Sequence, residues 1–314
     1  MCEANQTQVT QICLLGFQGL YKFKFVFFAG FLSSYILVLS GNFLIITLVT
    51  TSHHLKIPMF IFLKHLAITD ILLTTTIVPL MLHIILVDEG ILPFIGCIAQ
   101  LYCLGIFGCV QIFLITAMSY DRYLAICIPL RYASLMNIHV CLQLVVGLWF
   151  LGTLVMSSEI IVVCQLHFCG FNYIDHFFCD FVPVVELSTS DKFYFVIQDT
   201  ISNICIIASP FAFIVITYAC ISFSIMKISS ANGRRKAFST CSSHLTTVCT
   251  YYGTLITVYI VPTDFSSVNI NKYRSLLYLV VTPIMNPIIY SLRNREIKRT
   301  LLKLLRKSRK VIYV

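Results

Sequence analysis

The sequence predicts an all-α membrane protein in which seven helices cross the bilayer, and composition and hydropathy both support this fold class. Of the 314 residues, 58% are hydrophobic and 11% are charged, and the mean hydropathy is +0.90. Soluble globular proteins carry roughly 25% charged residues, so this chain has too few charges to cover a water-facing surface. A spanning helix needs about 20 mostly apolar residues. Seven such stretches lie at roughly 23–50, 59–87, 95–127, 140–163, 194–228, 236–261 and 272–292.

The basic residues predict which side of the membrane each end of the chain faces. Of the 22 Lys and Arg residues, all but five fall in the loops of one side or in the C-terminal tail. Basic loops stay in the cytoplasm, so the N-terminus should lie outside and the tail inside, against anionic lipid. The net charge of +9 therefore indicates membrane orientation and not nucleic-acid binding. The five exterior residues are Lys22, Lys24, Lys192, Lys272 and Arg274.

This orientation divides the chain into three parts. We expect an extracellular segment at 1–22, a seven-helix transmembrane domain at 23–292 and a basic cytoplasmic tail at 293–314. A short amphipathic helix should begin the tail. The sequon at Asn5 lies on the exterior side, so we expect it to be glycosylated.

The exterior cysteines lie in an oxidising compartment, where disulfides form. Cys97 opens the third stretch, and Cys164, Cys169 and Cys179 lie in a long loop at roughly 164–193. That loop is acidic and aromatic, and at its length it is either a functional lid or an ordinary solvated connection. The chain has no CxxC pair with metal-ligand spacing, so we expect no metal site.

Polar residues inside the hydrophobic stretches indicate function, because they are costly in lipid. Asn42, Asp70 and Asn286 lie at comparable depths and could converge on one cluster, holding either water or a sodium ion, or forming a structural hydrogen-bond network. Asp121 and Arg122 end the third stretch on the cytoplasmic side. These adjacent opposite charges could lock each other in a resting state.

Several motifs together resemble the olfactory receptor family of rhodopsin-like G-protein-coupled receptors. They occur in the family's order and extend over most of the chain. The motifs are HLKIPMF at 54–60, MSYDRYLAIC at 118–127, FCGFNYIDHFFCD at 168–180, KAFSTCSSHL at 236–245 and PIMNPIIYSLRN at 283–294.

The resemblance implies a plasma-membrane receptor of olfactory neuron cilia that binds a small odorant and activates a stimulatory G protein, without a cofactor. It implies a Cys97–Cys179 disulfide and a switch role for Tyr252 beneath the ligand. Arg122 would contact the G protein. The other residues implied in activation are Asp121, Tyr123, Tyr218, His244, Asn286, Pro287 and Tyr290.

Three residues depart from the family pattern. Thr189 replaces a loop cysteine, so Cys169 is either free or paired with Cys164. Gln111 replaces a glutamate that faces the Asp70 cluster in many relatives, which weakens the sodium proposal. Val261 replaces a basic residue, so a carboxylate ligand loses one anchor.

By the resemblance, the ligand pocket lies between the third, fifth, sixth and seventh stretches. Its mostly apolar lining suits a small, mostly hydrophobic ligand, which we expect to be neutral. Ser202, Asn203 and Tyr259 could bind the ligand or could equally bond helix to helix. Glu159 and Asp199 fit interfacial carboxylates facing water better than a cation site. The lining candidates are Leu104, Gly105, Gly108, Cys109, Ser202, Asn203, Ile206, Leu255, Ile256, Tyr259, Leu276 and Leu279.

Two other interpretations compete with an odorant receptor. A hormone receptor of the same fold would differ only in ligand and tissue. A transporter or channel should show repeated halves and broken helices, which the sequence lacks. An enzyme is disfavoured because no nucleophile–base spacing or phosphate-binding glycine loop stands out.

Overall fold

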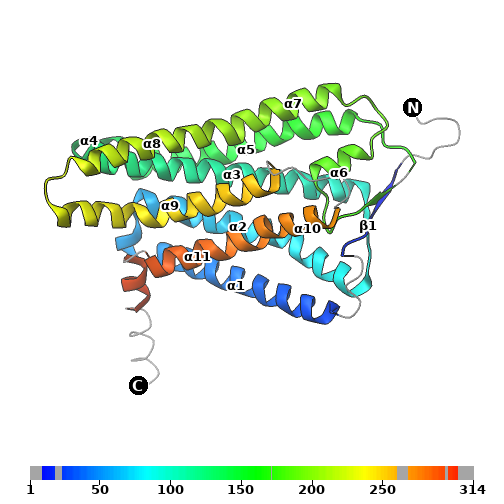
Figure 1. The fold of residues 1–314 in the computed structure, drawn as a ribbon, viewed down its shortest axis with the longest axis horizontal. Helices are drawn as coiled ribbons and strands as arrows, with labels where there is room; N and C mark the ends of the chain where they lie inside the picture. The colour runs from blue at the N-terminus through cyan, green and yellow to red at the C-terminus, as the bar shows by residue number, and fades with distance from the viewer. Residues whose placement is uncertain (1–8, 18–22, 171, 260–267, 294–295, 303–314) are drawn as a thin grey trace, which may run out of the picture.

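The computed structural model describes residues 9–17, 23–170, 172–259, 268–293 and 296–302. They form an elongated bundle of helices, with the strand β1 near one end and the C-terminal segment at the other (Figure 1). Among these residues, five helices are long and apolar enough to cross a membrane. They are α1 Lys24–Thr51, α2 Pro58–Val87, α3 Phe94–Cys127, α5 Ile138–Gln165 and the continuous helix Phe193–Met226.

Two further crossings complete the bundle and confirm the predicted seven-helix fold. The first of them is less apolar because it is rich in Ser and Thr. Their hydroxyls donate to carbonyls one turn earlier, as Thr246 does to Ser242 (2.8 Å) and Thr250 to Thr246 (2.9 Å). Such bonds satisfy the hydroxyl within its own helix. The two crossings are α9 Ala231–Tyr259 and the continuous α10 Val268–Leu276, η3 Leu277–Val281 and α11 Thr282–Arg293.

Two helices contain a wider, π-helical turn that ends two residues before a proline. In the fifth crossing, η2 (Ile204–Ala208) joins α7 (Phe193–Asn203) to α8 (Ser209–Met226) and precedes Pro210. In the seventh, η3 precedes Pro283 in the same way. Proline cannot donate a backbone N–H and its ring crowds the carbonyl four residues earlier, so a wider turn relieves the contact.

The helix α3 packs against α2, α5, α8 and α9. Its approach to α5 is close because Gly152 of α5 faces Val110 of α3. A Cβ atom on Gly152 would lie 2.9 Å from Val110 Cγ2, which is too short for an ordinary contact. Small residues let membrane helices approach closely, and dispersion contacts then hold them together.

A three-stranded sheet closes the extracellular end of the bundle, and the sequence analysis did not predict it. Its order is β2-β1-β3, with β1 antiparallel to β2 and parallel to β3. Ile12 and Leu14 of β1 are fully buried in a hydrophobic cluster that includes Ile84 of α2 and Ile98 of α3. Strands of two to four residues carry too little alternation to be recognised in a sequence. The strands are β1 Gln11–Leu14, β2 Gly90–Pro93 and β3 Tyr173–Ile174.

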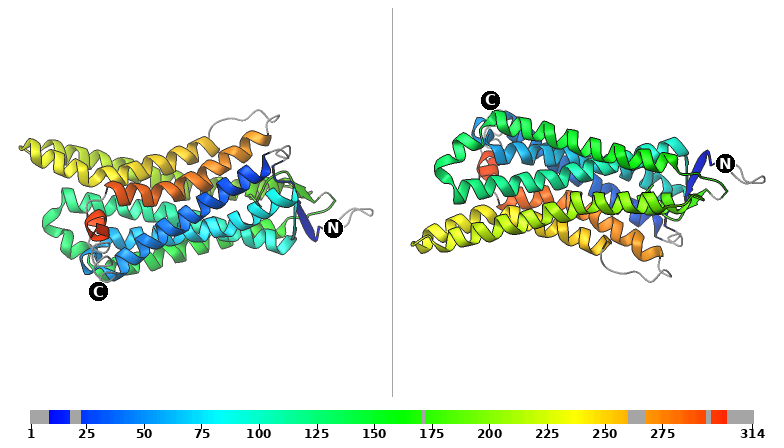
Figure 2. Two further views of the ribbon diagram at one scale, coloured as in Figure 1. Left: turned by 90° about the horizontal axis from the view of Figure 1, so that it is seen from below. Right: turned by 90° about the horizontal axis from the view of Figure 1, so that it is seen from above.

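The opposite end carries the short helix α4 (Pro129–Leu135) and a helical turn at residues 296–302. In the latter, Ile297 is buried and Leu301 packs on the core, while Lys298 and Arg299 are exposed. This pattern is the amphipathic helix expected after the seventh crossing. At the same end, α8 and α9 extend together past the other helices (Figures 1 and 2). Asn5 lies outside the described residues.

Replacing Gly152 with valine should destabilise the fold by about 1–3 kcal/mol, because the branched Val110 side chain cannot easily move aside. Gly147→Val is the matched control, since it lies in the same helix and a Cβ atom there meets nothing within 4 Å. We expect the purified Gly152→Val protein to show the lower thermal unfolding midpoint. Equal midpoints for the two variants would contradict the close contact between α3 and α5.

Candidate functional site

A cavity of about 260 Å³ lies between α3, α5, the α7–η2 segment, α9 and the α10–η3 segment, below the long extracellular loop. Much of its wall is apolar, with Ile112 and Met156 among the residues that sequence reasoning missed. Nine of the twelve residues proposed from the sequence line it: Leu104, Gly105, Gly108, Cys109, Ser202, Asn203, Ile206, Leu255 and Leu279.

Of the other three, Ile256 and Leu276 do not line this cavity. Ile256 is 43% exposed, because each step along a helix turns the side chain by about 100° from Leu255, which does line the cavity. Leu276 packs beside the cluster that contains Leu279. The side chain of Tyr259 lies outside the described residues.

Tyr251 lines the cavity, whereas Tyr252, proposed from the sequence as the switch residue, does not. The Tyr251 hydroxyl donates to the Gly108 carbonyl of α3 at 3.3 Å. Tyr252 is buried against Phe211 of α8, with their ring centroids 4.8 Å apart. Tyr251 therefore separates Tyr252 from the cavity, and the two rings are in contact at a centroid distance of 5.9 Å.

The long loop forms a structured lid, and the interpretation as a solvated connection is wrong. The predicted Cys97–Cys179 disulfide ties the loop to α3. The backbone N–H of Cys179 also donates to Gln100 Oε1 at 2.9 Å. Beyond it, α6 (Phe181–Glu186) lies over the cavity, which Phe178 and Phe181 help to line.

An ion pair and a hydrogen bond of Lys272 also hold the lid to the seventh crossing and to the N-terminal segment. The Lys272 ammonium is buried, forms an ion pair with Asp175 of the loop and donates to the Gly16 carbonyl at 2.6 Å. The Cys164–Cys169 disulfide considered from the sequence does not form. Cys164 is an exposed free thiol, and Cys169 forms a disulfide with another residue.

One wall of the cavity is polar. Glu159 of α5 is only 3% exposed and accepts a hydrogen bond from the Ser202 hydroxyl of α7. Asp199, also of α7, accepts from the Asn203 amide at 3.0 Å. All four residues line the cavity. The expectation that Glu159 faces water is therefore wrong, because α5 has apolar residues all round and its sequence does not reveal which face is inside.

A polar core lies deeper in the bundle around Asp70, which is fully buried. Gln111 donates to Asp70 Oδ1 at 2.8 Å, and Asn286 donates to Oδ2 at 2.9 Å. Asn42 does not join this carboxylate and instead donates to the Pro283 carbonyl at 3.3 Å. Since amide groups already occupy both carboxylate oxygens, the arrangement favours the structural network over an ion site.

The cytoplasmic end of α3 carries the predicted ion pair. Arg122 donates through Nε to Asp121 Oδ2 at 2.9 Å, and both side chains are buried. Tyr132 of α4, which sequence reasoning did not single out, donates to Asp121 Oδ1 at 2.8 Å. Tyr123 stacks on Tyr120, with ring centroids 6.4 Å apart. Asp121 thus holds Arg122 on one side and α4 on the other.

His244 of α9 connects three helices. Its Nε2 lies 3.1 Å from the Ile115 carbonyl of α3, and its Nδ1 lies 2.5 Å from the Tyr218 hydroxyl of α8. A carbonyl can only accept, so Nε2 carries the proton and Nδ1 accepts from the hydroxyl. Pro287 and Tyr290 of α11 are both buried. They follow Asn286 of the polar core in the same helix.

Comparison with known proteins agrees with this arrangement. The family model described as "Olfactory receptor" matches residues 31–308. The chain belongs to the olfactory receptor family. It is 44% identical to human olfactory receptor 5P3 over 98% of both chains, and 41% identical to human olfactory receptor 10A3 over 99% of both. It is 43% identical to mouse olfactory receptor 4E2 over 98% of this chain and 99% of that one.

Membership of this family establishes the general function. The protein is a multi-pass plasma-membrane receptor that responds to odorants through a G protein, and it is not an enzyme. The family does not identify the odorant, so the chemistry of the cavity must indicate it.

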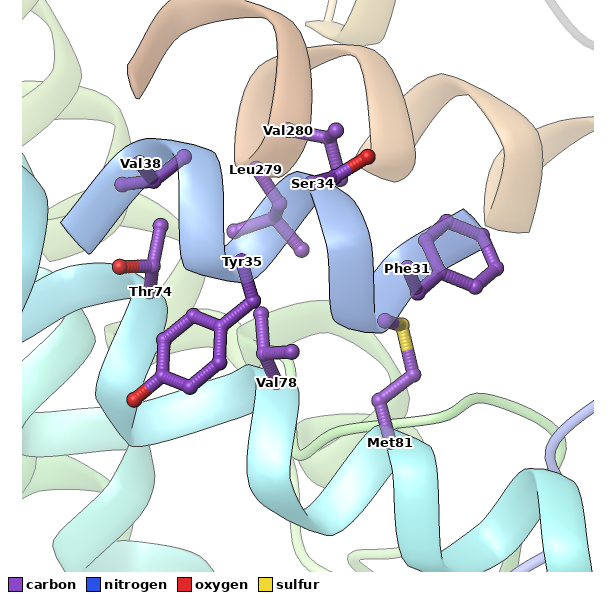
Figure 3. A pocket seen from close by; sticks show the side chains of 9 residues that line it. All are labelled: Phe31, Ser34, Tyr35, Val38, Thr74, Val78, Met81, Leu279 and Val280. Atoms are coloured by element: carbon purple, nitrogen blue, oxygen red, sulfur yellow. The ribbon is translucent and has the colours of Figure 1, made fainter. Parts of the chain in front are cut away.

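A second hollow in the receptor lies between α1, α2 and η3, and it is too small for an odorant. Its volume is about 10 Å³, roughly the space that one water molecule needs. Figure 3 shows Phe31 and Tyr35 of α1, Val78 and Met81 of α2 and Leu279 of η3 around it. Leu279 lines both hollows and so forms part of the wall between them.

The receptor's lid contains a buried histidine. His176 is 4% exposed and packs against the rings of Phe177 and Phe178, at centroid distances of 4.6 and 4.5 Å. Burial and the nearby Lys272 ammonium lower the pKa of His176 to about 3. Both effects disfavour the charged imidazolium.

Acidification should therefore destabilise the receptor through His176. An unfolded histidine binds its proton near pH 6.5, whereas folded His176 stays neutral down to about pH 3. The unfolded state binds more protons in this window, so stability falls as pH drops below about 6.5. We expect the thermal midpoint of purified receptor to fall between about pH 7 and about pH 5, and to fall less in His176→Phe. The exposed His139 gives the control His139→Phe, and an equal fall in both variants would exclude His176 as the cause.

Proposed function

We propose that the receptor binds a small, mostly hydrophobic odorant in the cavity below the lid and signals to a stimulatory G protein at Arg122. The observation that carries this proposal is the cavity below the lid, whose wall is largely apolar but contains a few polar side chains on one side. Leu104, Ile206 and Leu255 supply apolar contact, while Ser202 and Asn203 supply hydrogen bonds. Ligand pockets in proteins have this character, with a few placed polar groups in an apolar wall.

The residues below the cavity provide a route from the odorant to the G protein. Ile112 of α3 lines the cavity, and one turn further along the chain the Ile115 carbonyl holds His244 of α9. Ser119 then bonds to Thr217 of α8 at 2.5 Å, and Arg122 follows at the cytoplasmic end. A ligand that shifts α9 therefore acts on a bond that fastens α9 to α3.

The mechanism is a shift in population between two states of the bundle. The odorant stabilises a minor state in which α9 moves outward at its cytoplasmic end and breaks the His244 bonds. Arg122 then leaves Asp121 and accepts the G protein. The coupling is reciprocal, so the G protein must tighten odorant binding by the same factor. Family membership supports the choice of a stimulatory G protein.

Replacing Arg122 with alanine should abolish odorant-evoked cyclic AMP, because the group that contacts the G protein is removed. The exposed Arg299 of the amphipathic helix supplies the control Arg299→Ala, which should signal normally. Both variants are compared with the parent receptor in a cyclic AMP reporter assay, at matched surface expression. Normal signalling by Arg122→Ala would rule out the proposed role.

Filling the cavity from Gly108 should weaken the response to odorants. A Cβ atom on Gly108 would lie 3.3 Å from the Tyr278 hydroxyl, so a Gly108→Phe side chain occupies ligand space. We expect the half-maximal odorant concentration to rise at least ~10-fold, in line with an overpacking cost of about 1–3 kcal/mol. Gly147→Phe, placed where a Cβ atom meets nothing, is the control. An unchanged dose–response curve in Gly108→Phe would place the odorant elsewhere.

A further inference from the structure

The carboxylate of Glu159 is incompletely satisfied within the protein. Its Oε1 accepts from the Ser202 hydroxyl and the Gln198 side chain lies close to the carboxylate, but Oε2 is buried and receives no hydrogen bond of ordinary geometry from the described residues. Glu159 lines the cavity, and only 3% of its surface is exposed. A buried carboxylate oxygen without a donor is costly, and because Glu159 lies in the cavity wall, a ligand toward which its side chain turns can supply one.

The charges around the cavity all have the same sign. Its described lining contains three carboxylates, Glu159, Asp180 and Asp199, and no Lys, Arg or His. The other two carboxylates already have donors, since Asp180 accepts from the Phe181 N–H at 2.9 Å and Asp199 accepts from Asn203. Glu159 is therefore the member of this set that most needs a partner, and its burial strengthens its attraction for a cation.

We infer that the receptor recognises lipophilic amines, whose protonated amino group forms an ion pair with Glu159 while the hydrocarbon part contacts the apolar wall. An ammonium group brings up to three N–H donors and needs no acceptor in return. It can donate to Oε2 of Glu159 and keep further N–H groups for Asp199, which lines the same cavity. The hydrocarbon part then lies toward Leu104, Ile206 and Leu255.

Other odorant head groups fit this wall less well. A carboxylic acid is ionised at neutral pH and is repelled by Glu159 and Asp199. An aldehyde offers only an acceptor and leaves Oε2 without a donor, and an alcohol donates one bond without compensating the charge. The inference rests on the proposed odorant cavity and replaces the neutral ligand expected from the sequence, because that expectation placed Glu159 in water.

The test is a cyclic AMP reporter screen with sets of compounds that share one carbon skeleton and differ only in the head group. Linear and cyclic amines are each compared with the matching alcohol, aldehyde and acid. In the parent receptor we expect amines to be the most potent members of their sets and acids to be inactive. In Glu159→Gln, the half-maximal amine concentration should rise roughly 30-fold or more, while responses to alcohols change little.

Two further variants separate charge from shape. Glu159→Asp keeps the negative charge and should retain the preference for amines over alcohols, at lower potency. Glu186→Gln makes the same chemical change on an exposed glutamate of the lid, outside the cavity, and should behave as the parent receptor. Surface expression is measured for each variant. If Glu159→Gln fails to reach the surface, the amine-to-alcohol potency ratio of the parent receptor still decides the matter.

The outcomes distinguish this inference from the proposed function. Alcohols or aldehydes that act as well as amines, with potencies unchanged in Glu159→Gln, would overturn the amine inference and leave the odorant cavity intact. The absence of any response to amines would also overturn it. If odorants do not bind in this cavity at all, Gly108→Phe should respond to them as fully as the parent receptor does.

Discussion

Lipid offers no hydrogen bonds, so polar groups inside this bundle must find their partners within the protein. Many hydroxyls bond to a carbonyl of their own helix, whereas the carboxylate, amide and imidazole groups at the centre of the bundle bond across helices. Asp70 of α2 accepts from Gln111 of α3 and Asn286 of α11, and His244 of α9 bridges α3 and α8. Each of these contacts fixes the rotation of two or three helices at once. The bundle is therefore specified by a few polar contacts in an otherwise non-directional apolar core.

The functional features follow one another along α3. Its outer end carries Cys97, which fixes the lid, and its middle lines the cavity. Its inner half presents the Ile115 carbonyl to His244 and, closer to the cytoplasmic end, holds Arg122 against Asp121. In the proposed mechanism a ligand that moves α9 acts on the contacts through which His244 joins α9 to α3 and α8. The lid and the polar core hold the remaining helices in place.

The two π-helical turns contribute to the cavity itself. Residues of η2 and η3, among them Ile206 and Leu279, line it. A π-turn inserts one residue into the helical repeat, so it changes which side chains face inward on its extracellular side. Pro210 and Pro283 make the wider turns favourable by removing a backbone donor. The receptor thus uses proline both to widen its helices and to direct side chains toward the ligand.

Much of the molecule could be predicted from the sequence alone. Hydropathy determined the seven crossings, basic residues determined their direction, and the motifs indicated the family and the Cys97–Cys179 disulfide, because each of these signals is local or cumulative along the chain. Only the tertiary structure decided that Glu159 faces the cavity and that Tyr251, not Tyr252, reaches it. A membrane helix that is apolar all round carries no amphipathic signal. Its rotation, which turns neighbouring residues about 100° apart, is decided by packing against the other helices.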